Sequence, residues 1–346
     1  MIPINRHPGT SISWQDSTLS FFSGFSYLSL ESLASFKESI KKGIDIYGCV
    51  FPSSRISNVQ LDLYAQFETR LSDFTGLTAC CTFPSGYQAS QAAVMYAGKT
   101  SMLLFSPDCH PALRTGIASG IQFTRKEWPE AAVAYINSKE DNRCTLVCDS
   151  LNPLLSEVHS FDFLHRLKRR CRLVLDDSHG IGILGARGEG SISQLPKLPN
   201  CSYMVAFSLA KALSIQGGAI AGSEEEIREL RTLPVYTAST SLPPAGVYAL
   251  MDNFQHIDSQ RKILMERIRF LESLLPANLF NHDSRLPIFS SRSVALYAHL
   301  LKQGMVVSSF PYPGPSDPPI TRIVIQAGHT HEQLEGLAAC LRSFKN

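Results

Sequence analysis

The chain has 346 residues, of which 44% are hydrophobic and 18% are charged, a composition typical of a globular protein rather than a disordered one. Its formal net charge is +2 with acids and bases interspersed, which argues against a nucleic-acid-binding stripe or a charged interaction tail. No apolar stretch reaches the roughly 18 residues of a membrane span, and the first residues lack the pattern of a signal peptide. The nine cysteines form no CxxC pair, which favours reduced thiols in a cytoplasmic protein.

The N-terminal part, residues 1–45, is predicted to be an arm followed by a helix. Residues 17–30 are rich in serine and aromatic residues, which favours an extended arm, and a helix is expected over about 29–42. A further helix is predicted over 61–74, because apolar residues recur there at helical spacing.

Residues 46–255 alternate between short apolar strands and helical stretches. Strands are predicted at 79–83, 102–105, 145–148, 171–175, 204–207 and 218–221. These strands are apolar without alternation and several are separated by helices. The pattern therefore predicts an α/β fold whose largely parallel sheet is covered on both faces.

The pattern changes after about residue 255, where few strands accompany several helices. A long charged helix is expected over 257–275, with further helices over 293–303 and 332–344. Strands are expected at 286–289, 305–310 and 321–325, with a proline-rich loop over 311–319. Residues 256–346 are therefore predicted to form a small C-terminal α+β domain, following a large domain over 46–255.

Polar residues follow the ends of the predicted strands, where ligands bind in open parallel sheets. They are Ser85-Gly86-Tyr87, Asp108 and His110, Asp149, Asp176 and His179, and Ser208 with Lys211. A glycine at a strand-to-helix turn lets the backbone approach an anion closely. Ser85 is equally compatible with an ordinary helix N-cap.

Lys211 follows a strand directly, in an apolar setting with small neighbours. Burial lowers the pKa of an amine and makes it a usable nucleophile, whereas an exposed lysine is the ordinary interpretation. Asp176 ends an apolar strand and could hold the pyridine nitrogen of a cofactor protonated, or act as a structural turn acid. The phosphate-binding motif of P-loop NTPases is absent, and a zinc site of Asp176, His179 and His110 lacks any metal-ligand spacing.

The order of these motifs resembles the fold-type I enzymes that use pyridoxal 5′-phosphate (PLP), and more narrowly the α-oxoamine synthases. The resemblance runs from about residue 12 to the C-terminus. Its most specific part is Asp176-Asp177-Ser178-His179-Gly180 with the downstream Ser208-Leu209-Ala210-Lys211. It implies PLP as cofactor, a mostly parallel central sheet with a small C-terminal α+β domain, and a homodimer.

The resemblance also implies a role for each matching residue. Lys211 would form a Schiff base with PLP and move the substrate α-proton, and Asp176 would pair with the pyridine nitrogen. His179 would contact the ring hydroxyl, His110 would stack on the ring, and Arg322 would grip the amino-acid carboxylate with two parallel hydrogen bonds. The remaining cofactor-binding candidates are Ser85, Gly86, Tyr87, Asp149 and Ser208. No metal is implied.

The implied reaction is condensation of an amino acid with an acyl thioester, with loss of CO2. L-alanine and a pimeloyl thioester of coenzyme A or acyl carrier protein are expected, as in the 8-amino-7-oxononanoate synthases of biotin biosynthesis. Three alternatives stay open: a glycine C-acetyltransferase-like or other α-oxoamine synthase, an aminotransferase, and a PLP-binding partner protein without activity. They stay open because Phe25 and Pro153 stand where the family has an asparagine and a serine on the substrate side.

Overall fold

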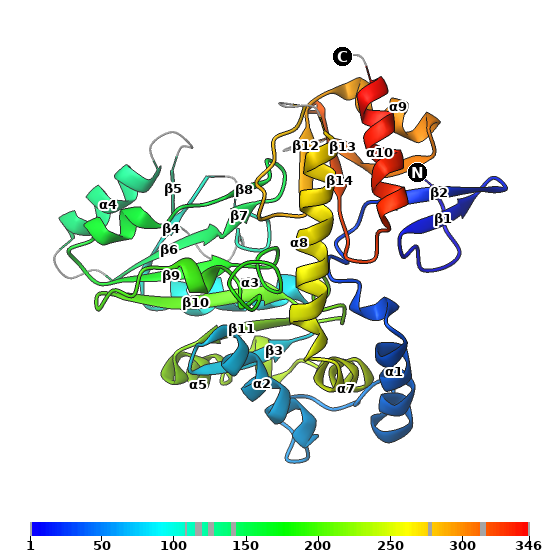
Figure 1. Cartoon of the computed structure of the whole chain (residues 1–346). Coiled ribbons are helices and arrows are strands. Elements are labelled where there is room, and N and C mark those ends of the chain that lie inside the picture. Colours follow the sequence, from blue (N-terminus) through cyan, green and yellow to red (C-terminus); the bar gives the residue numbers. More distant parts are fainter. Residues whose placement is uncertain are drawn as a thin grey trace.

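The computed structural model describes residues 2–107, 109–114, 120–123, 128–139, 143–275, 279–311 and 316–344. Asp108 of the sequence motif and most of the first half of the proline-rich loop lie outside these ranges. Two sheets organise the described chain, one of seven strands and one of five (Figure 1).

The seven-stranded central sheet has the order β3-β11-β10-β9-β6-β4-β5. Its strands are β3 (Ala79–Phe83), β4 (Met102–Phe105), β5 (Gly120–Gln122), β6 (Cys144–Asp149), β9 (Cys171–Asp176), β10 (Cys201–Ser208) and β11 (Gly218–Gly222). Strand β11 runs antiparallel to β10 and β3, and the other paired neighbours are parallel. The predicted α/β fold with a mostly parallel sheet is confirmed.

Both faces of this sheet are buried, which explains why its strands show no polar alternation. In β9, Leu173 and Leu175 point to one face and Val174 points to the other. Helices α3 (Gly86–Gly98), α5 (Glu224–Leu230) and α6 (Pro234–Thr237) pack on the face of Val174. Helices α2 (Asp62–Thr75), α4 (Trp128–Ser138) and α7 (Pro244–Asp252) contribute to the core on the opposite face.

The five-stranded sheet combines the two ends of the chain in the order β1-β2-β13-β14-β12. Its strands are β1 (Ser11–Trp14), β2 (Ser17–Phe22), β12 (Ile288–Ser291), β13 (Met305–Pro311) and β14 (Pro319–Val324). Part of the segment predicted as an extended arm is therefore a hairpin strand that pairs in parallel with β13. Its turn has positive φ at Gln15 and Asp16 and contains no glycine, so the usual hairpin signal is missing.

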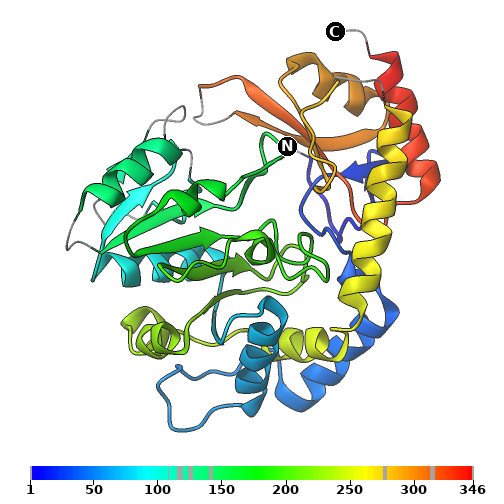
Figure 2. The ribbon, with the colours of Figure 1, turned by 60° about the vertical axis from the view of Figure 1, so that its left-hand side comes forward.

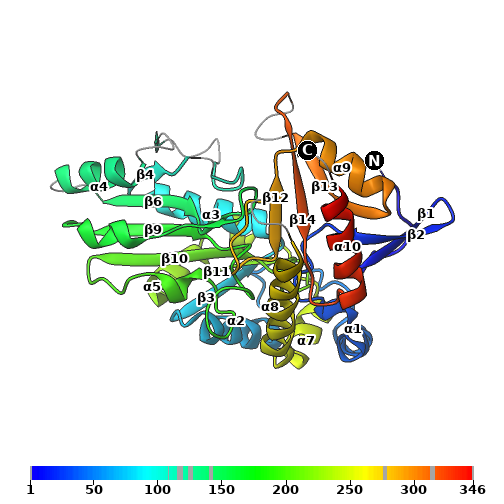
Figure 3. The same cartoon turned by 45° about the horizontal axis from the view of Figure 1, so that its top comes forward.

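Three helices flank the second sheet, and one of them joins it to the central sheet. Helix α8 (His256–Leu274) runs along one side of the molecule from the level of α7 to α10 (His331–Ser343), as Figure 2 shows. Helix α9 (Val294–Lys302) packs on β13, and Figure 3 shows it beside α10. The domain boundaries at residues 45 and 255 stay a prediction.

Three local features differ from the sequence prediction. Helix α1 (Ala34–Tyr47) begins five residues later than expected, after a 3-10 turn at Leu30–Ser32. Ser29, just before that turn, has a positive φ of 51° that an α-helix does not accept. The short strand β5 and the hairpin of β7 (Leu151–Asn152) and β8 (Glu157–Val158) were not expected.

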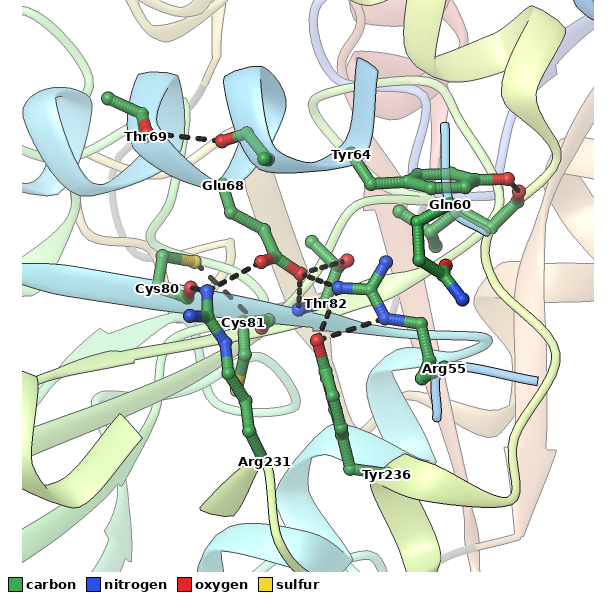
Figure 4. A network of polar contacts seen from close by, with 12 residues as sticks. Arg55, Gln60, Tyr64, Glu68, Thr69, Cys80, Cys81, Thr82, Arg231 and Tyr236 are labelled. Carbon is green, nitrogen blue, oxygen red and sulfur yellow. Dashed lines mark hydrogen bonds and ion pairs between the residues drawn. The ribbon is translucent and has the colours of Figure 1, made fainter. Parts of the chain in front are cut away.

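A buried charge cluster lies under one edge of the central sheet, and we call Arg55, Glu68, Thr82, Arg231 and Tyr236 the Glu68 cluster (Figure 4). Both arginines place an Nη2 atom 2.6 Å from the Glu68 carboxylate. Thr82 donates to the same carboxylate from its backbone N and its hydroxyl, at 2.9 and 2.8 Å. Arg55 Nε donates to the Tyr236 hydroxyl at 2.9 Å. The Glu68 cluster therefore ties the loop around Arg55 to α2, β3 and the chain after α5.

Within the described ranges, the structure contains no helix that is both long enough and apolar enough to cross a membrane.

Candidate active site

A cavity of about 760 Å³ opens beside the carboxyl ends of β6, β9 and β10. The residues predicted from sequence that line it are Gly86, Tyr87, His110, Asp149, Asp176, His179, Ser208, Lys211 and Arg322. Ser85 is not among the lining residues, and its hydroxyl oxygen accepts from Gln88 N at 3.1 Å as the N-cap of α3. Arg322 comes from β14 of the second sheet, so the cavity is built by both sheets.

The two adjacent acids after β9 have different surroundings. Asp176 lines the cavity, and its two carboxylate oxygens accept from the Ser90 hydroxyl at 2.7 Å and from Ser178 N at 2.9 Å. Asp177 is fully buried and accepts from the backbone N and the hydroxyl of Ser191. Burial raises the pKa of Asp177 to about 6. Asp176 is thus held in one orientation toward the cavity, and Asp177 anchors the loop behind it.

Lys211 and His179 form a contact at the centre of the cavity. Lys211 Nζ lies 3.0 Å from His179 Nε2, and Tyr27 OH lies 2.8 Å from His179 Nδ1. Burial lowers the pKa of Lys211 to about 8, although the nearby Asp176 and Asp149 favour its charged form. Burial and the charge of Lys211 hold the pKa of His179 well below its usual range. The imidazole is therefore neutral, and the amine has a substantial neutral fraction near pH 8.

The start of α3 lies unusually close to the end of β10. A Cβ on Gly86 would stand 2.7 Å from Ser208 Cβ, and a Cβ on Gly218 would stand 2.5 Å from Gly86 Cα. Only glycine permits this approach, which brings the helix N-terminus to the Ser208 side chain. Free N–H groups and the helix dipole favour an anion there. This end of the cavity suits a phosphate group.

Arg322 is a buried cation that makes no ion pair with any residue in the described ranges. Arg322 is only 5% exposed, and its Nε atom makes no hydrogen bond with a described residue. The guanidinium carbon lies 4.6 Å from the ring centre of Phe25 and 5.4 Å from that of Phe310. Burial lowers the pKa of Arg322. Among the residues that the structure describes, aromatic rings rather than a carboxylate lie beside this charge, so the cavity favours an anionic group there.

His110 and Asp149 complete the polar side of the cavity. The backbone N of His110 donates to Asp149 Oδ2 at 2.9 Å, and His110 Nδ1 accepts from Ala112 N at 3.2 Å. Burial lowers the pKa of His110. Burial and the negative charge of Asp176 raise the pKa of Asp149. The His110 ring is exposed in the cavity as a neutral imidazole that is free to lie against a planar ligand.

Sequence reasoning did not identify Ser90, Phe310 or Tyr27 as parts of this site. Ser90 lies one turn into α3, and its contact with Asp176 follows only from the packing of α3 on β9. Tyr27 appeared in a family motif but had no role there. Among the residues in the described ranges, no group of three or more His, Cys, Asp or Glu side chains is arranged to hold a metal ion.

Comparison with known proteins identifies relatives along most of the chain. No family model matches it. The 8-amino-7-oxononanoate synthase of Vibrio vulnificus is 25% identical over 339 residues, covering 92% of this chain and 86% of the relative. A serine palmitoyltransferase of Bacteriovorax stolpii is 23% identical over 275 residues, covering 76% of this chain and 65% of the relative. This chain is a homologue of the α-oxoamine synthases.

Solved structures support the same relationship at the level of the fold. The serine palmitoyltransferase of Sphingomonas wittichii superposes with a TM-score of 0.84 at 18% identity, covering 97% of this chain and 89% of that one. A structure described as SPT with PLP gives a TM-score of 0.86 at 17% identity, covering 99% and 91%. The predicted resemblance to the α-oxoamine synthases is therefore confirmed, and the relatives of this homologue are PLP-dependent C-acyltransferases.

Proposed function

We propose that this protein binds PLP through Lys211 and condenses an amino acid with an acyl thioester, releasing CO2. One observation carries the proposal. One cavity is lined by an amine with a lowered pKa, a fixed carboxylate, the glycine at an anion-binding helix start and a buried arginine that makes no ion pair with a described residue. PLP, when bound, supplies an electron sink for charge that develops at the amino-acid α-carbon.

The residues of the cavity fit the parts of PLP. The N-terminus of α3 at Gly86 and the Ser208 hydroxyl would hold the phosphate. The Asp176 carboxylate, fixed by Ser90 and Ser178, would hold the pyridine nitrogen protonated by a charge-assisted hydrogen bond. The His110 ring would lie against the cofactor ring.

Two side chains would act on the amino acid. Arg322 would bind its carboxylate with two parallel hydrogen bonds, which also relieves the cost of a buried unpaired charge. Lys211 Nζ would remove and return the α-proton, because a pKa near 8 leaves a neutral amine available at physiological pH. Asp149 carries a raised pKa and would hold His110 in place through its backbone N.

L-alanine and a pimeloyl thioester are the proposed substrates, by analogy with the relatives named 8-amino-7-oxononanoate synthase. The acyl carrier would be coenzyme A or acyl carrier protein.

One observation favours a second acyl donor, with an uncharged chain. The apolar part of the lining includes Pro107, Pro111, Ala112, Trp128, Leu151, Pro153 and Leu154. Glu157 is a further acid in the lining, and the only lysine or arginine side chains in the described lining are Lys211 and Arg322. A carboxylate at the far end of the chain would meet Glu157 rather than a cation. Serine palmitoyltransferase is among the relatives.

The first experiment tests the cofactor with absorbance. The purified protein is expected to show the visible band of covalently held PLP, and Lys211→Ala is expected to lose that band after dialysis. Lys302→Ala, which changes an exposed lysine on α9, is the matched control and should keep it. An unchanged spectrum in Lys211→Ala would show that another group holds the cofactor.

The second experiment tests the reaction with mass spectrometry of the products. Alanine and glycine are each offered with pimeloyl-CoA and with heptanoyl-CoA, which has the same chain length but no terminal carboxylate. An amino ketone and CO2 support the proposal, and the preferred thioester decides between the two acyl donors. An amino product without CO2 indicates an aminotransferase. Retained PLP without exchange of the alanine α-proton in D2O indicates a binding protein without activity.

We also propose a cytoplasmic homodimer. Ile44, Ile46, Val50, Ile56 and Val59 are exposed apolar side chains within one short segment, which a second copy would cover. The cysteines other than Cys144 are free thiols, as expected in a reducing compartment. Analytical ultracentrifugation should give twice the chain mass, and Ile56→Asp, at a site 72% exposed, should weaken the association.

A further inference from the structure

The hydrogen bond between Tyr27 and His179 links an N-terminal loop to the centre of the site. Tyr27 OH lies 2.8 Å from Nδ1 of His179, whose Nε2 lies 3.0 Å from Lys211 Nζ. The two residues are 152 positions apart in sequence. Tyr27 is fully buried. A short chain of contacts therefore runs from a tyrosine outside the cavity lining to the amine at its centre.

The backbone around Tyr27 is held at both sides, so the hydroxyl has a fixed position. Gly24 and Ser29 have φ values of 72° and 51°, which turn the chain before and after Tyr27. Ala327 N donates to the Tyr27 carbonyl at 2.8 Å and attaches this loop to the second sheet. The ring of Phe25 meets the His179 ring edge-on at 5.0 Å and limits its rotation.

The direction of the hydrogen bond follows from the partners available. A neutral imidazole carries one proton, on Nδ1 or on Nε2. If Nδ1 carried it, the Tyr27 hydroxyl would accept and its own proton would be buried without an acceptor among the described residues. If the hydroxyl donates to Nδ1, its proton is satisfied, and the nearby positive charge of Arg322 favours electron density on its oxygen. When the Lys211 amine is neutral, the second arrangement satisfies every group, because Nε2–H then donates to Lys211 Nζ. A protonated Lys211 is itself a donor and favours the Nδ1–H form instead.

We propose that Tyr27 is a positioning residue that fixes the Nε2–H tautomer of His179. In this state His179 is a hydrogen-bond donor toward the neutral amine of Lys211 in the cofactor-free protein, and it would be a donor toward the ring oxygen of a bound cofactor. Tyr27 itself touches neither. The groups that face His179 are Lys211, Arg322 and His110, all of which disfavour a second proton on the imidazole. The role toward the cofactor rests on the proposed function, whereas the tautomer does not.

The test compares Tyr27→Phe with Tyr64→Phe, which removes the hydroxyl of another buried tyrosine. Tyr64 is 2% exposed, and its hydroxyl donates to the Leu242 carbonyl at 2.8 Å, away from the cavity. The first readout is ¹⁵N NMR of histidine side chains in the purified protein, with His179→Asn identifying the His179 signals. In cofactor-free protein above pH 8, where the Lys211 amine is mostly neutral, wild type and Tyr64→Phe should show protonated Nε2 and unprotonated Nδ1, and Tyr27→Phe should gain the Nδ1–H form.

The second readout is the visible absorbance of the cofactor-loaded protein as a function of pH. Loss of a donor toward the ring oxygen should raise the midpoint in Tyr27→Phe by about one pH unit, the size of one hydrogen bond. The turnover number should fall by about 10-fold with little change in KM for the amino acid. Tyr64→Phe should match wild type in all three quantities.

The outcomes separate the two proposals. A wild-type His179 tautomer and an unchanged midpoint in Tyr27→Phe would overturn the role of Tyr27, even if turnover falls. If wild type shows no cofactor band, the proposed function fails, and the NMR comparison still decides whether Tyr27 fixes the tautomer.

Discussion

The Glu68 cluster and the cavity around Lys211 both bury charge, but they do so in opposite ways. In the Glu68 cluster the carboxylate receives hydrogen bonds from two arginines and from Thr82, and Arg55 also meets the Tyr236 hydroxyl (Figure 4). In the cavity, Arg322 makes no ion pair with any described residue. Lys211 contacts a neutral imidazole. One region is electrostatically complete within the described chain, and the other would be completed by the anionic ligand of the proposed function.

This difference separates stability from function. A buried charge that is paired and hydrogen-bonded lowers the stability of the fold little. Removing one partner leaves the other charge buried without compensation, which destabilises the fold strongly. The Glu68 cluster should therefore control the free energy of unfolding. The cavity should lower the free energy of unfolding of the ligand-free protein, because its cations are already buried before an anionic ligand binds.

Glu68→Gln is expected to have the largest effect on stability. It leaves the buried Arg55 without its carboxylate, whereas the Arg231 side chain is 44% exposed and can be solvated. The free energy of unfolding should therefore fall by about 3 kcal/mol, the lower end of the range for a broken buried ion pair. Urea unfolding measures the loss, with Glu335→Gln on the exposed face of α10 as the matched control. A loss below about 1 kcal/mol would mean that water already solvates the arginines.

Arg322→Gln should give the reverse pattern. The KM for the amino acid should rise by about 10²-fold, or about 3 kcal/mol, because the partner of the carboxylate is lost. The free energy of unfolding of the cofactor-free protein should stay the same or rise, because an unpaired buried charge is removed. Steady-state kinetics and urea unfolding measure the two, with the exposed Arg292→Gln as control. A loss of stability as large as that of Glu68→Gln would erase the contrast between the regions.

Much of this contrast rests on features that the sequence could predict. The strands at 79–83 and 102–105 agree with the structure residue for residue, because continuous apolar runs bounded by turns are strong signals. Since parallel strands end at one edge of a sheet, the candidates after those strands meet in one cavity.

The missed features depend on long-range packing. The hairpin β1–β2 reads as an arm because its partner β13 lies almost 300 residues later in the chain. Tyr27 reaches His179 only after the two sheets come together, and Ser90 reaches Asp176 only after α3 packs on β9. Phe25 was read as a missing asparagine, although its ring lies against Arg322. No local pattern contains these contacts.

The pH dependence of stability gives a further test of the cavity. The folded pKa of Lys211 is about 8, below the ordinary value of about 10.4 in the unfolded chain. Between these values the unfolded chain binds more protons at this amine, so the contribution of Lys211 to the free energy of unfolding should rise as pH increases from about 8 to about 10. Burial raises the pKa of eight cysteine thiols, which give a slope of the opposite sign, so the contribution of Lys211 is measured as a difference between wild type and a Lys211 variant. Below pH 8 both states hold the proton, and Lys211 costs the folded state about 2–3 kcal/mol.

Lys211→Met should stabilise the cofactor-free protein at pH 7, as measured by urea unfolding across pH. The gain in the free energy of unfolding relative to wild type should shrink as pH increases from about 8 to about 10. Lys302→Met should show no such pH-dependent difference from wild type. A difference between wild type and Lys211→Met that does not change with pH would show that the pKa of Lys211 is not lowered.

The smallest expected effect concerns the aromatic rings that stand in for a carboxylate beside Arg322. Phe25→Leu keeps an apolar side chain but removes the ring face, which should cost about 1 kcal/mol of stability and raise the KM for the amino acid about 5-fold. Phe310→Leu should do less, because its ring is 5.4 Å from the guanidinium carbon rather than 4.6 Å. The double-mutant cycle with Arg322→Gln isolates the contact. If Phe25→Leu costs as much stability in the Arg322→Gln background as in wild type, the ring contributes only packing, and Arg322 is compensated by the ligand alone.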